Sequence, residues 1–204
     1  MDIVEFDRIA VLESLRLVEK ASQDDWERPT PCAEWNLRQL VSHMAGQHEG
    51  FAASAAGGAG DLDAWRDRPL GSRPYDTYRE SAQRVLDAFA GDGILERSFR
   101  LPEVIPDFDF PASVAIGFHF LDYVVHAWDV ATALGIPLEL PDHVIEEALR
   151  IAALVPDDAS RRVPGAAFQP SVDLPSGAPP LDRLVVMLGR TLPGAGPSGA
   201  RRVA

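Results

Sequence analysis

The chain is poor in cysteine and lysine. Cys32 is the only cysteine among 204 residues, so no disulfide can form within the chain and a zinc site built on several cysteines is excluded. Lys20 is the only lysine, and the net charge of −12 argues against the clustered positive surface that nucleic-acid binding needs. Any metal site must therefore use histidine and carboxylate ligands, and we expect no nucleic acid as a partner.

Long apolar runs are also missing. No stretch approaches the roughly 18 uninterrupted apolar residues of a membrane span. The first residues, MDIVEFDRIAVLESL, mix acids into their apolar positions, unlike a signal peptide. We therefore expect a cytoplasmic protein with no membrane partner. A hydrophobic share of 46% and a charged share of 25% are typical of a globular protein.

What the sequence does contain is helical periodicity. Apolar residues recur three and four positions apart along most of the chain, which predicts an all-α fold. Asn36 and Gln39 form a capping box, and Pro111 and Gly135 suit the first position and the C-cap of the most apolar helix, which should be buried centrally. The expected helices cover residues 5–21, 36–54, 74–90 and 111–134, followed by one that begins after Pro141 and a short one after Pro180.

The remaining segments are rich in proline and glycine. Residues 94–110 favour an ordered loop or a short extended pair over a helix. Residues 156–180 predict a long covering loop, with a short strand at 166–174 as one option. We expect a single domain over 1–192 and a flexible C-terminal tail over 193–204, because that tail has little apolar content to anchor it.

The central helix carries a pair of potential metal ligands. Asp122 and His126 are four residues apart, which places them about 40° apart on one face and one turn apart along the axis. His43 is the natural third ligand, since an unpaired imidazole among apolar helix residues would be poorly solvated. Two histidines and one carboxylate are typical of a catalytic divalent-metal site. The same spacing also occurs in pairs that are simply solvated or buried in a core.

Other polar residues near this pair have two interpretations each. His119 lies seven residues from His126, about 10 Å along the axis, so it is either a supporting residue of the site or a buried, hydrogen-bonded histidine. Asp129 either orients a ring nitrogen or a metal-bound water, or is an ordinary polar position. His48 faces away from His43 and is expected at the surface, as is His143.

Three segments together resemble a known family. WERPTPCAEWNLRQLVSHMAG, then HFLDYVVHAWDVATALG, then PLDRLVVMLGR are similar to the metal-binding proteins related to mycothiol-dependent maleylpyruvate isomerase, within the DinB-like superfamily. The resemblance implies an up-down-down-up four-helix bundle with extra C-terminal helices and a long loop. It also implies a metal held by His43, Asp122 and His126, with Asp122 in place of the glutamate of the isomerase.

The resemblance extends to function only in part. The isomerase has a separate C-terminal domain that contributes a catalytic arginine, and here only about fifty residues follow the fifth expected helix, so that arginine is not carried over. The resemblance implies a divalent ion, zinc first and nickel or another ion as alternatives. It also implies mycothiol or a similar thiol as cosubstrate for transfer to, or isomerisation of, a small electrophile.

Two further alternatives stay open at this stage. The chain is either such an enzyme or a non-catalytic metal-binding or stress-associated module, and either a monomer or a homodimer. Cys32 is interpreted as a buried structural residue, because its neighbours Pro31 and Glu34 provide no activating cation. Trp35 and Trp128 either line a pocket or pack in the core.

Overall fold

The computed structural model describes residues 1–32, 35–58, 61–163, 166–174 and 177–194. Within these ranges the chain is mostly helical, as predicted, with one short two-stranded sheet. The helices are α1 (Ile3–Glu19), α2 (Leu37–Ala55), α3 (Pro74–Phe89), α4 (Ala112–Leu134), α5 (Asp142–Ala152) and α6 (Pro180–Met187). The strands are β1 (Ser98–Arg100) and β2 (Asp109–Pro111), and short 3₁₀ turns cover η1 (Leu62–Trp65), η2 (Ile94–Glu96) and η3 (Ala159–Arg162).

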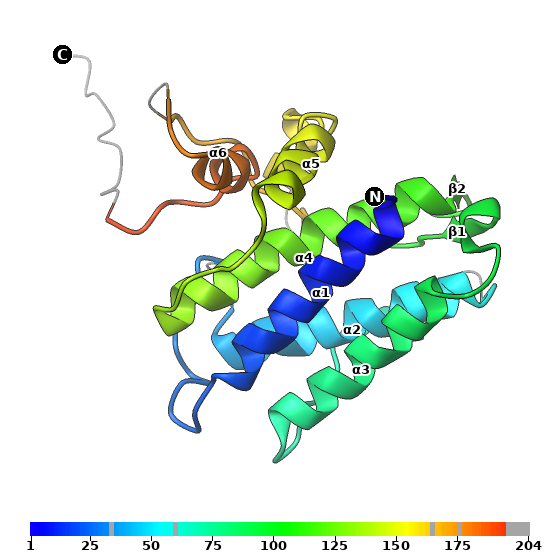
Figure 1. Cartoon of the computed structure of the whole chain (residues 1–204), viewed down its shortest axis with the longest axis horizontal. Helices are drawn as coiled ribbons and strands as arrows, with labels where there is room; N and C mark the ends of the chain where they lie inside the picture. The colour runs from blue at the N-terminus through cyan, green and yellow to red at the C-terminus, as the bar shows by residue number, and fades with distance from the viewer. Residues whose placement is uncertain (33–34, 59–60, 164–165, 175–176, 195–204) are drawn as a thin grey trace.

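The first four helices form a bundle. Figure 1 shows α1 and α4 running in one direction and α2 and α3 in the opposite direction, which is the expected up-down-down-up order. Apolar side chains from all four helices meet in one core, whose fully buried members include Leu17, Leu40, Met44, Tyr78, Phe120 and Val124. Burial of these side chains supplies the main driving force for folding.

Helix α4 is the central element of the bundle. Most of its residues are buried, as its apolar character predicts. Gly135 ends the helix with a φ of 67°, a left-handed conformation that favours glycine. Pro111 was expected at the first helical position, but it is the last residue of β2 and the cap of α4.

Helix α2 begins at the predicted capping box. The Asn36 side chain accepts a hydrogen bond from the Gln39 backbone at 2.9 Å, and the Gln39 side chain accepts one from the Asn36 backbone at 3.0 Å. Further along α2, Gly46 and Gly50 allow the segment that follows α2 to approach closely. A Cβ at Gly46 would lie 2.5 Å from the carbonyl oxygen of Arg66, and one at Gly50 would lie 2.3 Å from the Trp65 ring.

The C-terminal part packs against the bundle through α5 and α6. Figure 1 shows both helices on one side of α4. Arg161 is buried and donates hydrogen bonds to the backbone carbonyls of Pro156, Val155, Met187 and Gln169, at 2.7, 3.0, 2.7 and 3.3 Å. One buried guanidinium therefore ties the loop after α5 to the end of α6.

Two expectations about the connecting segments have different outcomes. The region 94–110 contains the expected extended pair, with Phe99 opposite Phe110 in an antiparallel register. The short strand expected at 166–174 is wrong: these residues form no strand. Their neighbours are the Arg161 side chain and helix α6, which offer no strand edge for pairing.

The expected tail over 193–204 lies outside the described residues beyond Gly194. In the described part, none of the helices combines the length and the apolar character that crossing a lipid bilayer requires.

Candidate metal centre

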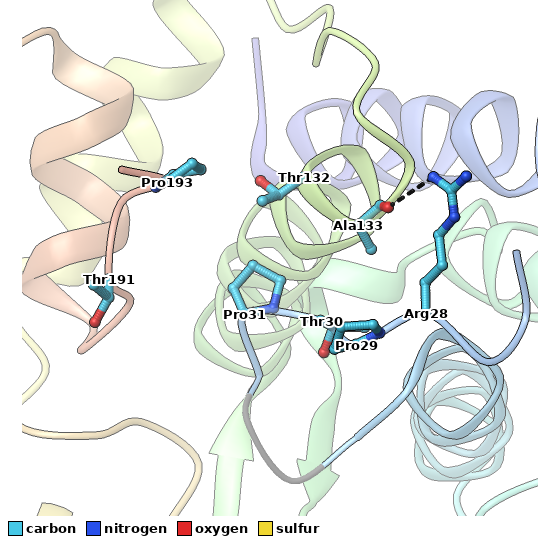
Figure 2. A pocket seen from close by; sticks show the side chains of 8 residues that line it. All are labelled: Arg28, Pro29, Thr30, Pro31, Thr132, Ala133, Thr191 and Pro193. Atoms are coloured by element: carbon cyan, nitrogen blue, oxygen red, sulfur yellow. Dashed lines mark hydrogen bonds between the residues drawn. The ribbon is translucent and has the colours of Figure 1, made fainter. Parts of the chain in front are cut away.

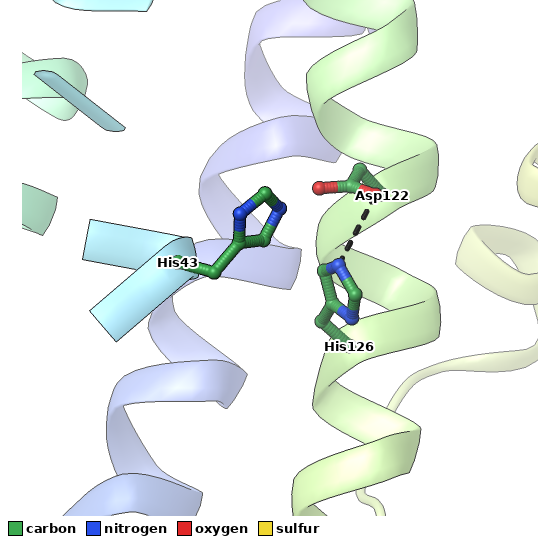
Figure 3. A group of neighbouring side chains, drawn as sticks. All are labelled: His43, Asp122 and His126. Atoms are coloured by element: carbon green, nitrogen blue, oxygen red, sulfur yellow. Dashed lines mark ion pairs between the residues drawn. The ribbon is translucent and has the colours of Figure 1, made fainter. Parts of the chain in front are cut away.

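Three side chains from two helices converge at one point of the bundle. His43 comes from α2, and Asp122 and His126 come from successive turns of α4 (Figure 3). One ligand atom from each lies within 4.8 Å of the others, and His126 Nε2 is 3.4 Å from Asp122 Oδ1. His126 is buried, while His43 and Asp122 are half-buried. The spacing on α4 and the packing of α2 beside it therefore bring together the three residues that the sequence singled out.

The size of this cluster suits a divalent ion. Ligand distances of about 2.0–2.2 Å in tetrahedral geometry place ligand atoms about 3.3–3.6 Å apart. The 3.4 Å separation of Asp122 and His126 already matches this value, so the shorter aspartate still reaches the point at which His126 is aimed. The ligand atom of His43 lies within 4.8 Å of both other ligand atoms.

Both ring nitrogens of His126 face carboxylate oxygens. Nδ1 is 3.0 Å from Asp129 Oδ2, and Nε2 is 3.4 Å from Asp122 Oδ1. A neutral imidazole carries one N–H and can donate to only one of the two carboxylates. A second proton or a cation between Nε2 and Asp122 would therefore offset the negative charge of the second carboxylate.

His43 has a carboxylate partner of its own. Its Nδ1 is 3.2 Å from Asp67 Oδ1, which leaves Nε2 for a ligand, and Figure 3 shows a ring nitrogen of His43 turned toward Asp122. Asp67 lies beside His43 because Gly46 admits the backbone of residues 66–67, and because Ser42 exchanges two hydrogen bonds with Arg68, at 2.7 and 3.0 Å. Metal-binding histidines in proteins are commonly oriented in this way through their second nitrogen.

Burial also prepares His43 to bind a cation. Removal from water lowers its pKa, and the neighbouring imidazole of His126 lowers it further, against the opposing effect of Asp122 and Asp67. A lowered pKa keeps the ring neutral at physiological pH. The ring nitrogen therefore carries the lone pair that a metal ion needs.

Asp129 connects the site to the C-terminal end of the described chain. It is fully buried and accepts hydrogen bonds from Arg190, which follows α6. Burial alone would raise the pKa of Asp129, but the hydrogen bond from His126 and the charge of Arg190 outweigh it and hold the pKa below its usual value. Asp129 thus stays ionised and holds the Nδ1 side of His126.

Sequence reasoning missed Asp67 and Arg190. Two signals could have indicated them: Gly46 and Gly50, four residues apart in an otherwise regular helix, mark the close approach of another segment. A lone arginine directly after the apolar run LVVMLG marks a buried charge that needs a partner.

The expectation about Cys32 needs correction. The residue is half-buried rather than buried, and a cation does lie nearby, because Cys32 is among the groups whose charge raises the pKa of Arg190. That cation comes from 158 positions further along the chain, so inspection of Pro31 and Glu34 could not reveal it.

His119 and His48 lie in the core, away from the three converging side chains. His119 Nδ1 is 2.6 Å from Asp7 Oδ1, and both residues are fully buried, which matches the buried and hydrogen-bonded alternative for His119. His48 was expected at the surface and is instead fully buried, 3.0 Å from the Ser81 hydroxyl. It lies four residues after Met44 and therefore on the same buried face of α2, where its ring stacks on Tyr123 of α4 at 4.4 Å and lies 5.2 Å from the Tyr78 ring of α3. His143 is exposed, as expected.

The two tryptophans have separate roles. The Trp35 ring lies 4.5 Å from the His43 ring and 6.4 Å from the His126 ring, so it forms one wall of the centre. Trp128 packs with Val185 and Val186 of α6, in agreement with the core-packing alternative.

A groove of about 330 Å³ lies between the loop at 28–31, the end of α4 and the segment after Arg190 (Figure 2). Arg28 lines one edge of it and donates a hydrogen bond to the carbonyl of Ala133 at 3.3 Å, while its guanidinium also pairs with Asp25 at 2.8 Å. None of the three converging residues lines this groove. Its polar groups are threonine hydroxyls and an arginine that is already paired.

The chain has recognisable relatives. Residues 8–131 match the family described as the mycothiol maleylpyruvate isomerase N-terminal domain. An uncharacterized protein of Mycobacterium tuberculosis, found in two strains, is 30% identical over 182 residues, which are 86% of this chain and 91% of the relative. Among solved structures, a mutant of the mycothiol-dependent maleylpyruvate isomerase matches with a TM-score of 0.59 at 13% sequence identity, over 74% of this chain and 66% of that chain.

These matches differ in what they show. The solved isomerase, of which this chain covers just under two thirds, confirms the expected DinB-like all-α fold and nothing about chemistry at 13% identity. The family match covers more than half of the chain, and the mycobacterial relative matches along most of its length. The chain therefore belongs to the family of the mycothiol maleylpyruvate isomerase N-terminal domain.

Proposed function

We propose that the chain binds one divalent metal ion through His43, Asp122 and His126, and uses it to activate a low-molecular-weight thiol toward small electrophiles. Zinc is the first choice of ion, with nickel as an alternative, because imidazole and carboxylate ligands suit both. Mycothiol is the proposed thiol, since the family and the solved isomerase are both named for it.

One observation carries the metal proposal: each of the two histidines has a carboxylate on its Nδ1. Asp67 holds His43 and Asp129 holds His126, while Asp122 supplies the third ligand. Solvated surface histidines do not need to be held in this way around a third carboxylate. Histidines that are held in this way are typical of a metal centre.

The thiol part of the proposal follows from the charge that such a centre adds. A bound divalent ion favours the thiolate form of a thiol brought to it. In an addition to an activated double bond, the sulfur bonds to one carbon and the thiol proton ends on the other, so no oxidant or reductant is required. Trp35 shields the ligands from water on one side, and no nucleophile from the chain itself is needed.

The test is a thiol-consumption assay. Zinc-loaded protein is incubated with mycothiol and an activated alkene whose absorbance falls on thiol addition, and the rate is compared with that of His126→Ala and of His143→Ala, a matched histidine variant at an exposed position in α5. We expect the His143 variant to match the wild type, and the His126 variant to fall to the metal-free rate. Equal rates for all three proteins would reject the thiol function.

The alternative of a non-catalytic metal-binding module is separated by the same samples. It predicts tight zinc binding with no rate above the metal-free control. It also predicts that mycothiol causes no spectral change in cobalt-substituted protein.

A further inference from the structure

Arg190 is a buried arginine from the far end of the described chain. Its side chain is 4% exposed, and the carboxylate it meets, Asp129, is completely buried. Arg190 Nε donates to both Asp129 oxygens, at 3.0 and 3.2 Å, and Nη2 donates to Oδ2 at 2.8 Å. Removing both charges of such a pair from water costs free energy. Other contacts must offset this cost, or the pair must serve a function.

Asp129 Oδ2 contacts both Arg190 and His126. It accepts from Arg190 Nη2 at 2.8 Å and lies 3.0 Å from His126 Nδ1. The guanidinium fork fixes the plane of the carboxylate, and the carboxylate fixes the ring of His126 about its χ2 angle. Arg190, Asp129 and His126 therefore form a continuous chain of contacts that ends at a ligand atom.

The local backbone delivers Arg190 to this position. Gly189 has a φ of +84°, and a Cβ there would lie 2.5 Å from the Gln169 carbonyl oxygen, so only glycine fits at this turn. Arg161 holds both sides of the turn, because it donates to Met187 and to Gln169 at 2.7 and 3.3 Å. The turn directly before Arg190 is thus held in place, and it directs the Arg190 side chain into the bundle.

We infer that Arg190 is a positioning residue of the metal centre, which sets the orientation of His126 through Asp129. The C-terminal segment is then a structural part of the centre, although it contributes no ligand. This inference rests on the proposed metal site, and it extends the site from α2 and α4 to the end of the described chain.

The positioning role of Arg190 depends on the shape of its guanidinium as well as on its positive charge. Replacing Arg190 by methionine removes the guanidinium that holds the Asp129 carboxylate. The carboxylate is then free to turn, and His126 loses its fixed orientation. Replacing Arg190 by lysine keeps a positive charge but cannot present two parallel N–H groups. Arg183, which is exposed on α6, provides a matched control.

The experiment measures cobalt(II) affinity, by competition with a chelating dye, together with the visible absorption of the bound cobalt. We expect Arg190→Met to weaken binding about 10- to 100-fold, the usual effect of losing an outer hydrogen-bond partner. Arg190→Lys should weaken binding less and still shift the absorption bands, and Arg183→Met should match the wild type. Wild-type affinity and spectrum in a folded Arg190→Met protein would overturn the inference. If that variant does not fold, the same result in Arg190→Lys would overturn it.

A second readout separates this inference from the metal proposal. If the wild type binds no cobalt, the proposed function fails, and the His126 ring resonances in NMR spectra of the metal-free protein decide the inference alone. We expect them to shift and broaden in Arg190→Met and to stay unchanged in Arg183→Met. Identical His126 resonances in the wild type and Arg190→Met would overturn the positioning role.

Discussion

Replacing Gly46 by alanine tests how the segment after α2 supports the metal centre. The added Cβ would lie 2.5 Å from the Arg66 carbonyl oxygen and 3.2 Å from Asp67 Cα, where ordinary contacts begin at about 3.4 Å. The backbone at 66–67 must therefore retreat by about 1 Å. Asp67 would move with it, away from a His43 nitrogen that it now meets at 3.2 Å.

We expect two measurable effects. Overpacking of this kind costs about 1–3 kcal/mol of unfolding free energy, which urea denaturation would measure. Loss of the Asp67 contact should weaken zinc or cobalt binding about tenfold, which is the usual effect of losing a hydrogen-bond partner of a metal-binding histidine.

Gly117→Ala is the matched control. Gly117 also lies inside a helix, but the nearest side-chain atom to its added Cβ would be 3.7 Å away, an ordinary contact. Alanine is favoured over glycine in helix interiors by up to about 1 kcal/mol, so this variant should be slightly more stable than the wild type. If Gly46→Ala is as stable as Gly117→Ala and binds metal equally well, the proposed support of His43 by the 66–67 segment is wrong.

Three further predictions concern single residues. Asp67→Asn should weaken cobalt binding by up to about tenfold with little loss of stability, since Asp67 is exposed; unchanged affinity would show that the His43 contact is incidental. Burial lowers the pKa of His48 well below its usual value, so below about pH 6.5 the unfolded chain takes up a proton that the folded chain does not. Between pH 7.5 and 5.5 the wild type should therefore lose about 1.4 kcal/mol more than His48→Asn in urea unfolding, and equal losses would contradict the buried neutral state. Gly189→Ala should destabilise the C-terminal part and weaken metal binding together, whereas wild-type behaviour would mean that the turn at Gly189 does not position Arg190.

Much of the bundle was predictable because local signals agree with the tertiary structure. The capping box at Asn36 marks the start of α2, and Gly135 marks the end of α4. The first helix begins two residues earlier than expected, since the Asp2 side chain caps it by accepting from the Glu5 backbone at 3.0 Å. The strand expected at 166–174 failed because the neighbours of that segment depend on tertiary packing.

The site was predictable only along one helix. The i, i+4 spacing of Asp122 and His126 fixes their relation on α4, whatever the rest of the chain does. Asp67 and Arg190 reach the centre through packing between distant segments, so Gly46 and the arginine after the apolar run mark a close approach and a buried charge but do not identify the partner of either. Sequence reasoning thus indicated the ligands and missed the groups that orient them.

Metal stoichiometry after zinc loading and removal of excess ion is the most direct test of the proposed centre. Elemental analysis would compare the wild type with His43→Ala, His126→Ala and the exposed control His143→Ala. We expect about one zinc per chain in the wild type and in the His143 variant, and close to none in the other two. Equal zinc content in all four proteins, whether high or near zero, would contradict a metal centre at His43, Asp122 and His126.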